Sequence, residues 1–321
     1  MVNLGEILKA RYRIQNYIHK TPLMFSETLS EETSANVYVK LESLQKTGAF
    51  KIRGIYNKVL STLERLATPT FVTASSGNHG LGLAYVCREL KIPCTVVVPT
   101  YTPHIKINAI QRLGANLILD GNNWNEAYLR AEIISKREES ILIHPFEDES
   151  IICGQGTIGL EILEEIPHPN YFFASIGGGS MIASNALVFK ELSPRTKVIG
   201  LQTYGGDAMY QSVKNGRRTK LKSITSKVES FATKEVGKKT FALVQKHVDE
   251  IYRHTDQECE KAALFMLERS HILLELSASI CVAALLKHSE PIKKNETVVL
   301  TFCGGNYDLN QLASMLSNSA P

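Results

Sequence analysis

The sequence predicts an α/β protein in which helices flank parallel sheets, and three observations support this prediction. Short apolar segments rich in β-branched residues recur along the chain, bounded by Gly, Pro, Asn or Asp, as is typical of buried strands. Amphipathic segments lie between them, and this alternation favours parallel strands joined by helices. Turns rich in Gly, Ser and Asn follow some of the strands, where parallel sheets bind their ligands.

The predicted elements alternate along the chain as a parallel sheet requires. Strands are expected at Thr70–Ala74, Cys94–Val98, Leu117–Leu119, Ile141–Ile143, Tyr171–Ile176, Val198–Leu201 and Thr297–Phe302. Helices are expected at Gly80–Leu90, Thr102–Leu113, Asn125–Lys136, Gly156–Glu165, Met181–Leu192, Asp256–Arg269 and Ala278–His288. The polar stretch Asn215–Thr233 has no clear periodicity and is expected to form a long loop.

Length and composition indicate a soluble protein with two domains. A chain of 321 residues is long for a single hydrophobic core. A hydrophobic fraction of 44% and a charged fraction of 21% are ordinary for globular proteins. The net charge of +4 is a weak bias and gives no reason to expect nucleic acid as a partner. The densest basic stretch, Lys214–Lys227, is expected to be a solvated loop, with an anionic ligand or partner as the alternative.

Cysteine usage and the N-terminal segment indicate a cytoplasmic protein. The six cysteines form no Cys-x-x-Cys pair and no cluster with histidine, so they are expected to be small buried side chains in a reducing compartment. Met1–Lys9 lacks the pattern of a signal peptide, and no apolar run is long enough to suggest a membrane span.

Three turns are candidate ligand sites: Ser75–Gly80, Gly177–Ser180 and Cys303–Asn306. The successive glycines of Gly177–Ser180 let a ligand approach the backbone closely, and free N–H groups of the following helix favour a phosphate. The spacing matches neither a nucleotide-hydrolase loop nor a dinucleotide-binding loop, which argues against a nicotinamide oxidoreductase. A tight turn without a ligand is the alternative.

Lys51 is a candidate for covalent chemistry with a carbonyl group. Its neighbours Phe50 and Ile52 are apolar, and desolvation lowers the pKa of an amine, which makes the amine a better nucleophile. Taken alone, a lysine in such a mixed segment is more often a surface residue.

Together, these motifs resemble those of the fold-type II pyridoxal-phosphate family, which includes threonine and serine dehydratases, serine racemase and, more distantly, threonine and cysteine synthases. The matching segments are Lys40–Gly54, Ser75–His79, Gly154–Thr157, Gly177–Gly179, Leu274–Glu275 and Cys303–Asn306. The first is similar to the family's cofactor-lysine segment, and order and spacing agree from about Leu8 to Leu309.

The resemblance implies a two-domain fold similar to that of the tryptophan synthase β subunit. A large cofactor-binding domain would combine residues 1–68 and 147–321, and a small mobile domain, residues 69–146, would close over the substrate. The resemblance also implies pyridoxal 5'-phosphate as the cofactor, a small amino acid as the substrate, and assembly into a homodimer or homotetramer.

The resemblance also assigns roles to single residues. Lys51 would hold the cofactor and then act as the base on the substrate Cα proton. Phe50 would pack on the cofactor ring, Asn78 would contact its hydroxyl group, and Cys303 would face its nitrogen, with a simple buried apolar role as the alternative for Cys303. The cofactor phosphate would be bound by Gly177, Gly178, Gly179, Ser180 and Met181. The substrate would be bound by Ser75, Ser76, Asn78 and His79.

Four departures bear on the reaction. Ser76 stands where racemases of the family carry a serine that acts as acid or base, whereas many dehydratases carry Ala; the alternative is a serine that binds a carboxylate or caps a helix. The Glu and Asp that bind a divalent cation in racemases correspond to Gln202 and Ala208, so no metal is expected. Glu229-Ser230-Phe231 corresponds to an Ala-Asp-Gly turn that the family has close to the cofactor, so Phe231 replaces a glycine. In the phosphate-binding turn, Ser180 replaces a fourth glycine.

The first hypothesis is therefore a threonine or serine ammonia-lyase, which would give 2-oxobutanoate or pyruvate plus ammonia. A serine or related amino-acid racemase with side lyase activity is the closest alternative, followed by a β-replacement synthase. A non-catalytic cofactor-binding protein is a further alternative, which Phe231 and Gln202 motivate.

Overall fold

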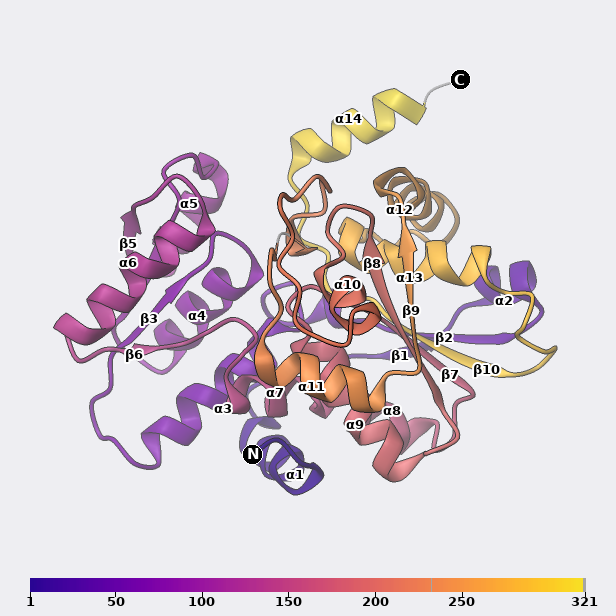
Figure 1. Cartoon of the computed structure of the whole chain (residues 1–321), viewed down its shortest axis with the longest axis horizontal. Helices are drawn as coiled ribbons and strands as arrows, with labels where there is room; N and C mark the ends of the chain where they lie inside the picture. Colours follow the sequence, from indigo (N-terminus) through magenta and orange to yellow (C-terminus); the bar gives the residue numbers. More distant parts are fainter. Residues whose placement is uncertain (232, 320–321) are drawn as a thin grey trace. The chain divides into compact units, whose positions relative to one another are not determined.

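The structure, a computed structural model, describes residues 1–231 and 233–319 and divides the chain into two compact units. Unit 1 consists of Met1–His19 and Lys51–Gln155, and unit 2 of Lys20–Phe50 and Gly156–Pro321. Each unit has its own mainly parallel sheet with flanking helices, which confirms the predicted α/β class (Figure 1).

The sheet of unit 1 has four parallel strands in the order β5-β4-β3-β6. Their bounds are Phe71–Ala74 for β3, Cys94–Val98 for β4, Asn116–Leu119 for β5 and Ile141–Leu142 for β6. Successive side chains of a strand point to opposite faces. Val72, Ala74 and Val97 therefore pack against α6 (Trp124–Arg137), while Val96 and Val98 pack against α4 (Asn78–Glu89) and α5 (His104–Gln111).

Three further helices complete unit 1: α1 (Leu4–Ile14), α3 (Lys51–Leu63) and α7 (Glu149–Gln155). Helices α3 and α7 cross at two glycines. A Cβ atom on Gly154 would lie 2.6 Å from Gly54 Cα, so the two backbones can approach this closely only because neither residue has a side chain.

The sheet of unit 2 has six strands in the order β1-β2-β10-β7-β8-β9, and only the edge strand β1 runs antiparallel to its neighbour. The strands are β1 (Leu23–Phe25), β2 (Asn36–Lys40), β7 (Tyr171–Ser175), β8 (Lys197–Thr203), β9 (Glu250–His254) and β10 (Thr297–Thr301).

Helices cover both faces of the unit 2 sheet. Figure 1 shows α12 (Asp256–Ser270) and α13 (Leu276–Lys287) on one side, and α8 (Thr157–Glu165), α9 (Ser180–Leu192) and α11 (Lys238–His247) on the other. The remaining elements are α2 (Glu27–Thr33), η1 (Glu42–Leu44), α10 (Ala208–Lys214), η2 (Glu229–Phe231) and α14 (Leu309–Ser319).

Every predicted strand and helix corresponds to an element of the structure. The sequence interpretation missed β1, β2 and β9, and the helices α1, α2, α3, α7, α10, α11 and α14. The predicted long loop is confirmed for the described residues between α10 and α11, where η2 is the only regular element; Ala232 lies outside the described residues.

The predicted domain boundaries differ from the bounds of the two units. Helices α1, α3 and α7 were expected in the large domain, but they pack with the segment that carries β3 to β6. The prediction that residues 69–146 move to close over substrate concerns motion and stays a prediction.

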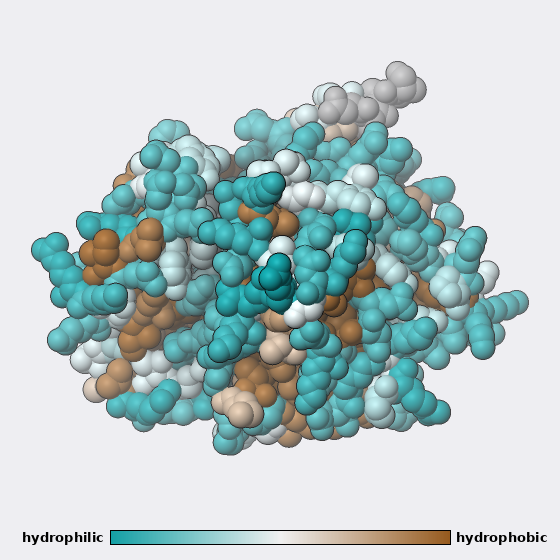
Figure 2. Space-filling view, in the orientation of Figure 1, coloured by the Kyte–Doolittle hydropathy of each residue, from teal (hydrophilic) through white to brown (hydrophobic). Residues whose placement is uncertain are grey.

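The surface and the cysteines agree with the compositional expectations. All six cysteines are free and buried. Figure 2 shows mostly hydrophilic residues on the visible face, with apolar residues in separate patches. In the described part of the chain, no helix has the length and apolarity needed to cross a bilayer.

Candidate active site

Lys51 and the Ser75–Gly80 turn meet in unit 1, at the carboxyl ends of β3 and β6. The Nζ amine of Lys51 donates a hydrogen bond to the Pro145 carbonyl oxygen at 3.3 Å. Two residues earlier, the Ile143 carbonyl oxygen lies 3.4 Å from Nε2 of His79. The segment that follows β6 therefore holds both Lys51, at the start of α3, and His79, at the start of α4.

The Ser75–Gly80 turn leaves the N-terminus of α4 open. The N-cap residue is Gly77, and no side chain caps the helix. Gly77 N–H donates to Ser75 Oγ at 3.3 Å, and a Cβ atom on Gly80 would collide with the Ser75 carbonyl oxygen. The N–H groups at an uncapped helix N-terminus suit a carboxylate. Ser76 does not cap α4, so the capping role was wrong, whereas the carboxylate-binding role of Ser76 stays a prediction.

His79 is a neutral, buried imidazole in this half of the site. Its side chain is only 3% exposed, and burial, assisted by the nearby Lys51 charge, lowers its pKa to about 3. When Nε2 donates to the Ile143 carbonyl oxygen, Nδ1 is an acceptor, and this buried atom has no partner among the described residues. A polar group of a ligand would satisfy it.

The other two glycine-rich turns meet in unit 2. Gly177–Ser180 follows β7 and Cys303–Asn306 follows β10, and these strands are parallel neighbours in the sheet. Ser175 Oγ lies 3.5 Å from Cys303 Sγ, so the two turns start at the same edge.

The Gly177–Ser180 turn has the features of a phosphate-binding loop. Helix α9 begins at Ser180, its N-cap Gly179 has φ +95°, and no side chain caps it. The turn is buried apart from a half-buried Gly177. A Cβ atom on Gly177 would collide with the Ser230 carbonyl oxygen, and one on Gly179 would lie 2.7 Å from Met209 Cε. Buried amide groups at an uncapped helix N-terminus suit an anion.

The cofactor-lysine segment and the Cys303–Asn306 turn are paired through their backbones within unit 2. Phe50 N–H donates to the Cys303 carbonyl oxygen at 3.0 Å, and Gly305 N–H donates to the Gly48 carbonyl oxygen at 2.9 Å. An isolated antiparallel bridge between Ala49 and Gly304 joins the same two segments. The two motifs are thus adjacent in space, although they lie far apart in the sequence.

Cys303 is buried in the hydrophobic core of unit 2, and its sulfur also lies beside polar groups. Its sulfur is 3.3 Å from Ser277 Oγ and 3.5 Å from Ser175 Oγ, and Glu275 Oε1 accepts a hydrogen bond from Ser277 at 2.6 Å. These neighbours are compatible with a polar role for Cys303, and its burial is compatible with the simple apolar alternative, so both stay predictions. Glu275 belongs to the matching segment Leu274–Glu275, but the sequence alone did not predict a role for it.

The two unusual residues, Gln202 and Phe231, are both accommodated in unit 2. The side-chain amide of Gln202 donates to the carbonyl oxygens of Ile176 and Gly206 at 3.0 and 3.1 Å and accepts from Tyr210 N–H at 2.8 Å. Phe231 is 1% exposed and belongs to the hydrophobic core, so its ring fills the core. The absence of a metal stays a prediction.

Lys40, at the start of the cofactor-lysine segment, has a structural role that the sequence interpretation missed. Its side chain is fully buried, and Nζ lies 2.7 Å from Glu161 Oε2 and 2.6 Å from the Thr21 carbonyl oxygen. This buried ion pair joins β2 to α8 and anchors the segment that leads to Phe50.

The predicted site residues fall into two groups, one in each unit. Unit 1 holds Lys51, Ser75, Ser76, Asn78 and His79. Unit 2 holds Phe50, Gly177, Gly178, Gly179, Ser180, Met181 and Cys303. One of the points where the chain passes from one unit to the other is the peptide bond between Phe50 and Lys51, which are consecutive residues of the two groups.

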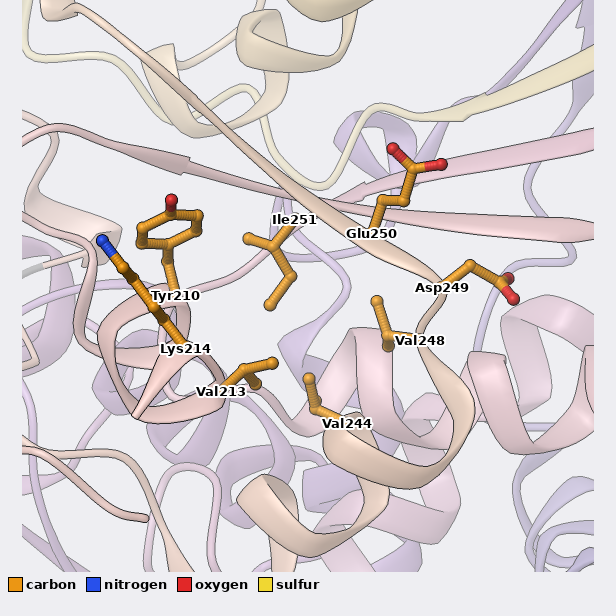
Figure 3. Close-up of a pocket in the computed structure, with 8 residues that line it drawn as sticks. All are labelled: Tyr210, Val213, Lys214, Val244, Val248, Asp249, Glu250 and Ile251. Atoms are coloured by element: carbon orange, nitrogen blue, oxygen red, sulfur yellow. The ribbon is translucent and has the colours of Figure 1, made fainter. Parts of the chain in front are cut away.

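A pocket of about 140 Å³ lies elsewhere in unit 2, between α10, α11 and β9 (Figure 3). Val213, Val244, Val248 and Ile251 point into it. The carboxylates at its rim have partners of their own, because Lys190 binds Asp249 and the Tyr252 hydroxyl binds Glu250. The pocket contains none of the predicted site residues.

Comparison with known proteins defines the class. The family model described as "Pyridoxal-phosphate dependent enzyme" matches residues 14–304, so the chain belongs to this family, and its cofactor is pyridoxal 5'-phosphate. An L-threonine ammonia-lyase of Thermotoga maritima is 38% identical, over 99% of this chain and 79% of the relative.

Solved structures agree with this assignment. The processed form of threonine deaminase isoform 2 from Solanum lycopersicum superposes with a TM-score of 0.92 at 32% identity, covering 99% of this chain and 89% of that chain. Maize serine racemase superposes with a TM-score of 0.92 at 27% identity, covering 99% of this chain and 97% of that chain.

Proposed function

We propose that this protein is a pyridoxal-phosphate-dependent ammonia-lyase that converts L-threonine to 2-oxobutanoate, or L-serine to pyruvate, with release of ammonia. The observation that carries the proposal is the 38% identity to an L-threonine ammonia-lyase over 99% of the chain. The segments of this sequence that resemble the family include Lys51, Ser75 and Gly177–Gly179.

The side chains and amides of this chain fit the cofactor. The buried, uncapped N-terminus of α9 would bind the phosphate through the amides of Gly177–Met181. Phe50 would contact the ring, Asn78 its hydroxyl group, and Cys303 its nitrogen. When bound, the cofactor supplies an electron sink for the negative charge that develops at the substrate Cα.

The protein's own groups would bind and activate the substrate. Lys51 would anchor the cofactor and take the Cα proton. The N-terminus of α4 would hold the substrate carboxylate through the backbone N–H of His79 together with Ser75, Ser76 and Asn78. Loss of the β-hydroxyl group and hydrolysis then give the 2-oxo acid and ammonia.

Racemisation is the second candidate function, and Ser76 favours it. This side chain does not cap α4 and is half-buried, which leaves its hydroxyl group for catalysis. The likeness to maize serine racemase supports this candidate. In a racemase, Ser76→Ala should abolish racemisation and retain elimination.

The proposal extends to the setting of the enzyme. It acts in the cytoplasm as a homodimer or homotetramer, needs no divalent cation, and closes residues 69–146 over its substrate. The amide of Gln202 supports independence from a cation, because it is uncharged, its N–H₂ group cannot ligate a cation, and its oxygen accepts a hydrogen bond from Tyr210 N–H.

An absorbance spectrum combined with a 2-oxo acid assay tests the proposal. The purified protein should show a cofactor band near the visible edge that borohydride removes, and it should release 2-oxo acid from L-threonine or L-serine. Lys51→Ala should lose both, whereas Lys136→Ala, which changes an exposed lysine of α6, should keep both. A cofactor band without 2-oxo acid from either substrate would contradict the lyase assignment.

A further inference from the structure

His144 lies at the edge of the unit 1 sheet where the candidate site residues meet. Ile143 N–H donates to the Val72 carbonyl oxygen at 2.8 Å, so the chain stays paired with β3 to the end of β6. His144 therefore leaves β6 at the edge where Ser75 leaves β3. Carboxyl ends of adjacent parallel strands are where such sheets bind ligands.

Contacts connect His144 with Lys51 and with the start of the Ser75–Gly80 turn. On one side, the next residue, Pro145, accepts the hydrogen bond from the Lys51 amine at 3.3 Å. On the other side, the indole N–H of Trp124 donates to the Ala74 carbonyl oxygen at 2.9 Å, directly before the Ser75–Gly80 turn. The ring centroid of the same indole lies 6.2 Å from that of His144.

The imidazole ring of His144 is held in one orientation. Nδ1 accepts hydrogen bonds from the N–H groups of Phe146 and Glu147, at 3.2 and 3.1 Å. Aromatic rings of Phe146 and Tyr128 pack against it edge-on, with centroids 4.4 and 5.2 Å away. Because Nδ1 is an acceptor, the proton of the neutral ring is on Nε2.

The Nε2–H group of His144 has no hydrogen-bond acceptor among the described residues of unit 1. The side chain is half-buried, so this N–H group is available to a ligand. Burial, together with the Lys51 charge, lowers the pKa of His144 to about 4. At neutral pH the ring is therefore uncharged, and it can donate a hydrogen bond without acting as an acid.

We propose that His144 is a further substrate-binding residue, and that its Nε2–H donates a hydrogen bond to the β-hydroxyl oxygen of the substrate. The inference rests on the proposed lyase function. The α4 N-terminus accounts for the substrate carboxylate and Lys51 for the Cα proton, so the β-hydroxyl is the polar group of the substrate that still needs a partner. A fixed neutral donor stabilises this oxygen as its bond to carbon breaks.

His144→Asn separates the donor from the structural role of the ring. The Asn side-chain oxygen can replace Nδ1 as acceptor for the two backbone N–H groups, but the variant lacks a group at the position of Nε2. We expect an unchanged cofactor spectrum and melting temperature, and a kcat/KM for L-threonine that is lower by about 10- to 100-fold. His104→Asn, on the exposed start of α5 in the same unit, is the matched control and should behave like the wild type.

A substrate without the hydroxyl group distinguishes donation from packing. β-Chloro-L-alanine eliminates chloride in place of hydroxide, so its kcat/KM should be equal within about twofold in the wild type and in His144→Asn. His144→Gln, which can place an amide N–H near the position of Nε2, should recover part of the activity on L-threonine.

Three results would overturn the inference. The first is a kcat/KM of His144→Asn on L-threonine equal to that of the wild type, and the second is a loss by the same factor on both substrates. The third applies if His144→Asn is unstable: no recovery of activity in His144→Gln over His144→Ala at equal cofactor content. A wild type that releases no 2-oxo acid from either substrate would instead refute the proposed function, so the two failures are distinguishable.

Discussion

Replacing Lys40 by Met should destabilise the protein strongly, because it breaks a buried ion pair. Lys40 is fully buried, and its amine lies 2.7 Å from the Glu161 carboxylate, whose side chain is 6% exposed. The amine also donates to the Thr21 carbonyl oxygen at 2.6 Å. Met has a similar length and fills the volume, so the change removes the charge and its hydrogen bonds while leaving the packing largely intact.

The expected loss follows from the carboxylate that remains. Removing Lys40 takes the amine away from the buried Glu161 carboxylate, and breaking a buried pair in this way costs about 3–5 kcal/mol of unfolding free energy. Lys20→Met is the matched control, because Lys20 pairs with Glu164 at 3.1 Å and these side chains are 54% and 42% exposed. Breaking such an exposed pair should cost at most about 1 kcal/mol.

A double variant tests whether the charge is the cause. Lys40→Met combined with Glu161→Leu removes both charges, and it should recover most of the loss, since apolar replacement of a buried pair is often close to neutral. Urea unfolding at neutral pH gives the free energies. The reasoning is refuted if Lys40→Met lies within about 1 kcal/mol of the wild type, or if the double variant is as unstable as the single one.

Three further predictions concern unit 1 and the glycine turn. First, the His144 pKa of about 4 is below the usual value near 6.5, so between these two pH values the unfolded chain binds more protons than the folded chain. The contribution of His144 to stability is therefore fully present above about pH 6.5 and falls by up to about 3 kcal/mol towards pH 4. Urea unfolding at pH 7 and pH 4.5 would measure this loss, and an equal loss in His144→Asn would contradict the assignment. Second, Gly177→Ala places a methyl group against the Ser230 carbonyl oxygen, so it should weaken cofactor retention at least tenfold on dialysis, and full retention would count against a phosphate loop here. Third, Gly154→Ala forces its Cβ to within 2.6 Å of Gly54 Cα, so we expect a loss of about 1–3 kcal/mol in thermal unfolding, and an unchanged melting temperature would show that α3 and α7 can move apart.

Much of the fold could be predicted because its buried strands are short and β-branched. The strand at Cys94–Val98 was predicted at its observed bounds, since Pro and Thr follow a continuous apolar run. Edge strands were missed, because β9 (Glu250–His254) is half-solvated and carries charged residues. Helix α3 was missed because Gly54 and several β-branched residues lower its helix propensity, and tertiary packing against α7 overrides that preference.

The glycine and serine turns of the candidate site could be predicted because they directly follow strands. The supporting residues could not, since their roles depend on partners that lie far away in the sequence. Lys40 needs Glu161, and Cys303 needs Ser175 and Ser277. His144 did carry a signal: like the three turns, it comes directly after a predicted strand, Ile141–Ile143.

The central claim is that the Lys51 amine carries pyridoxal 5'-phosphate in an ammonia-lyase. Borohydride reduction of the purified protein, followed by proteolysis and mass analysis of the peptides, tests this claim most directly. The account predicts one pyridoxyl-modified peptide, with the modification on Lys51, and loss of 2-oxo acid formation in proportion to that modification. Modification of a different lysine, or full activity after Lys51 has been modified, would contradict it.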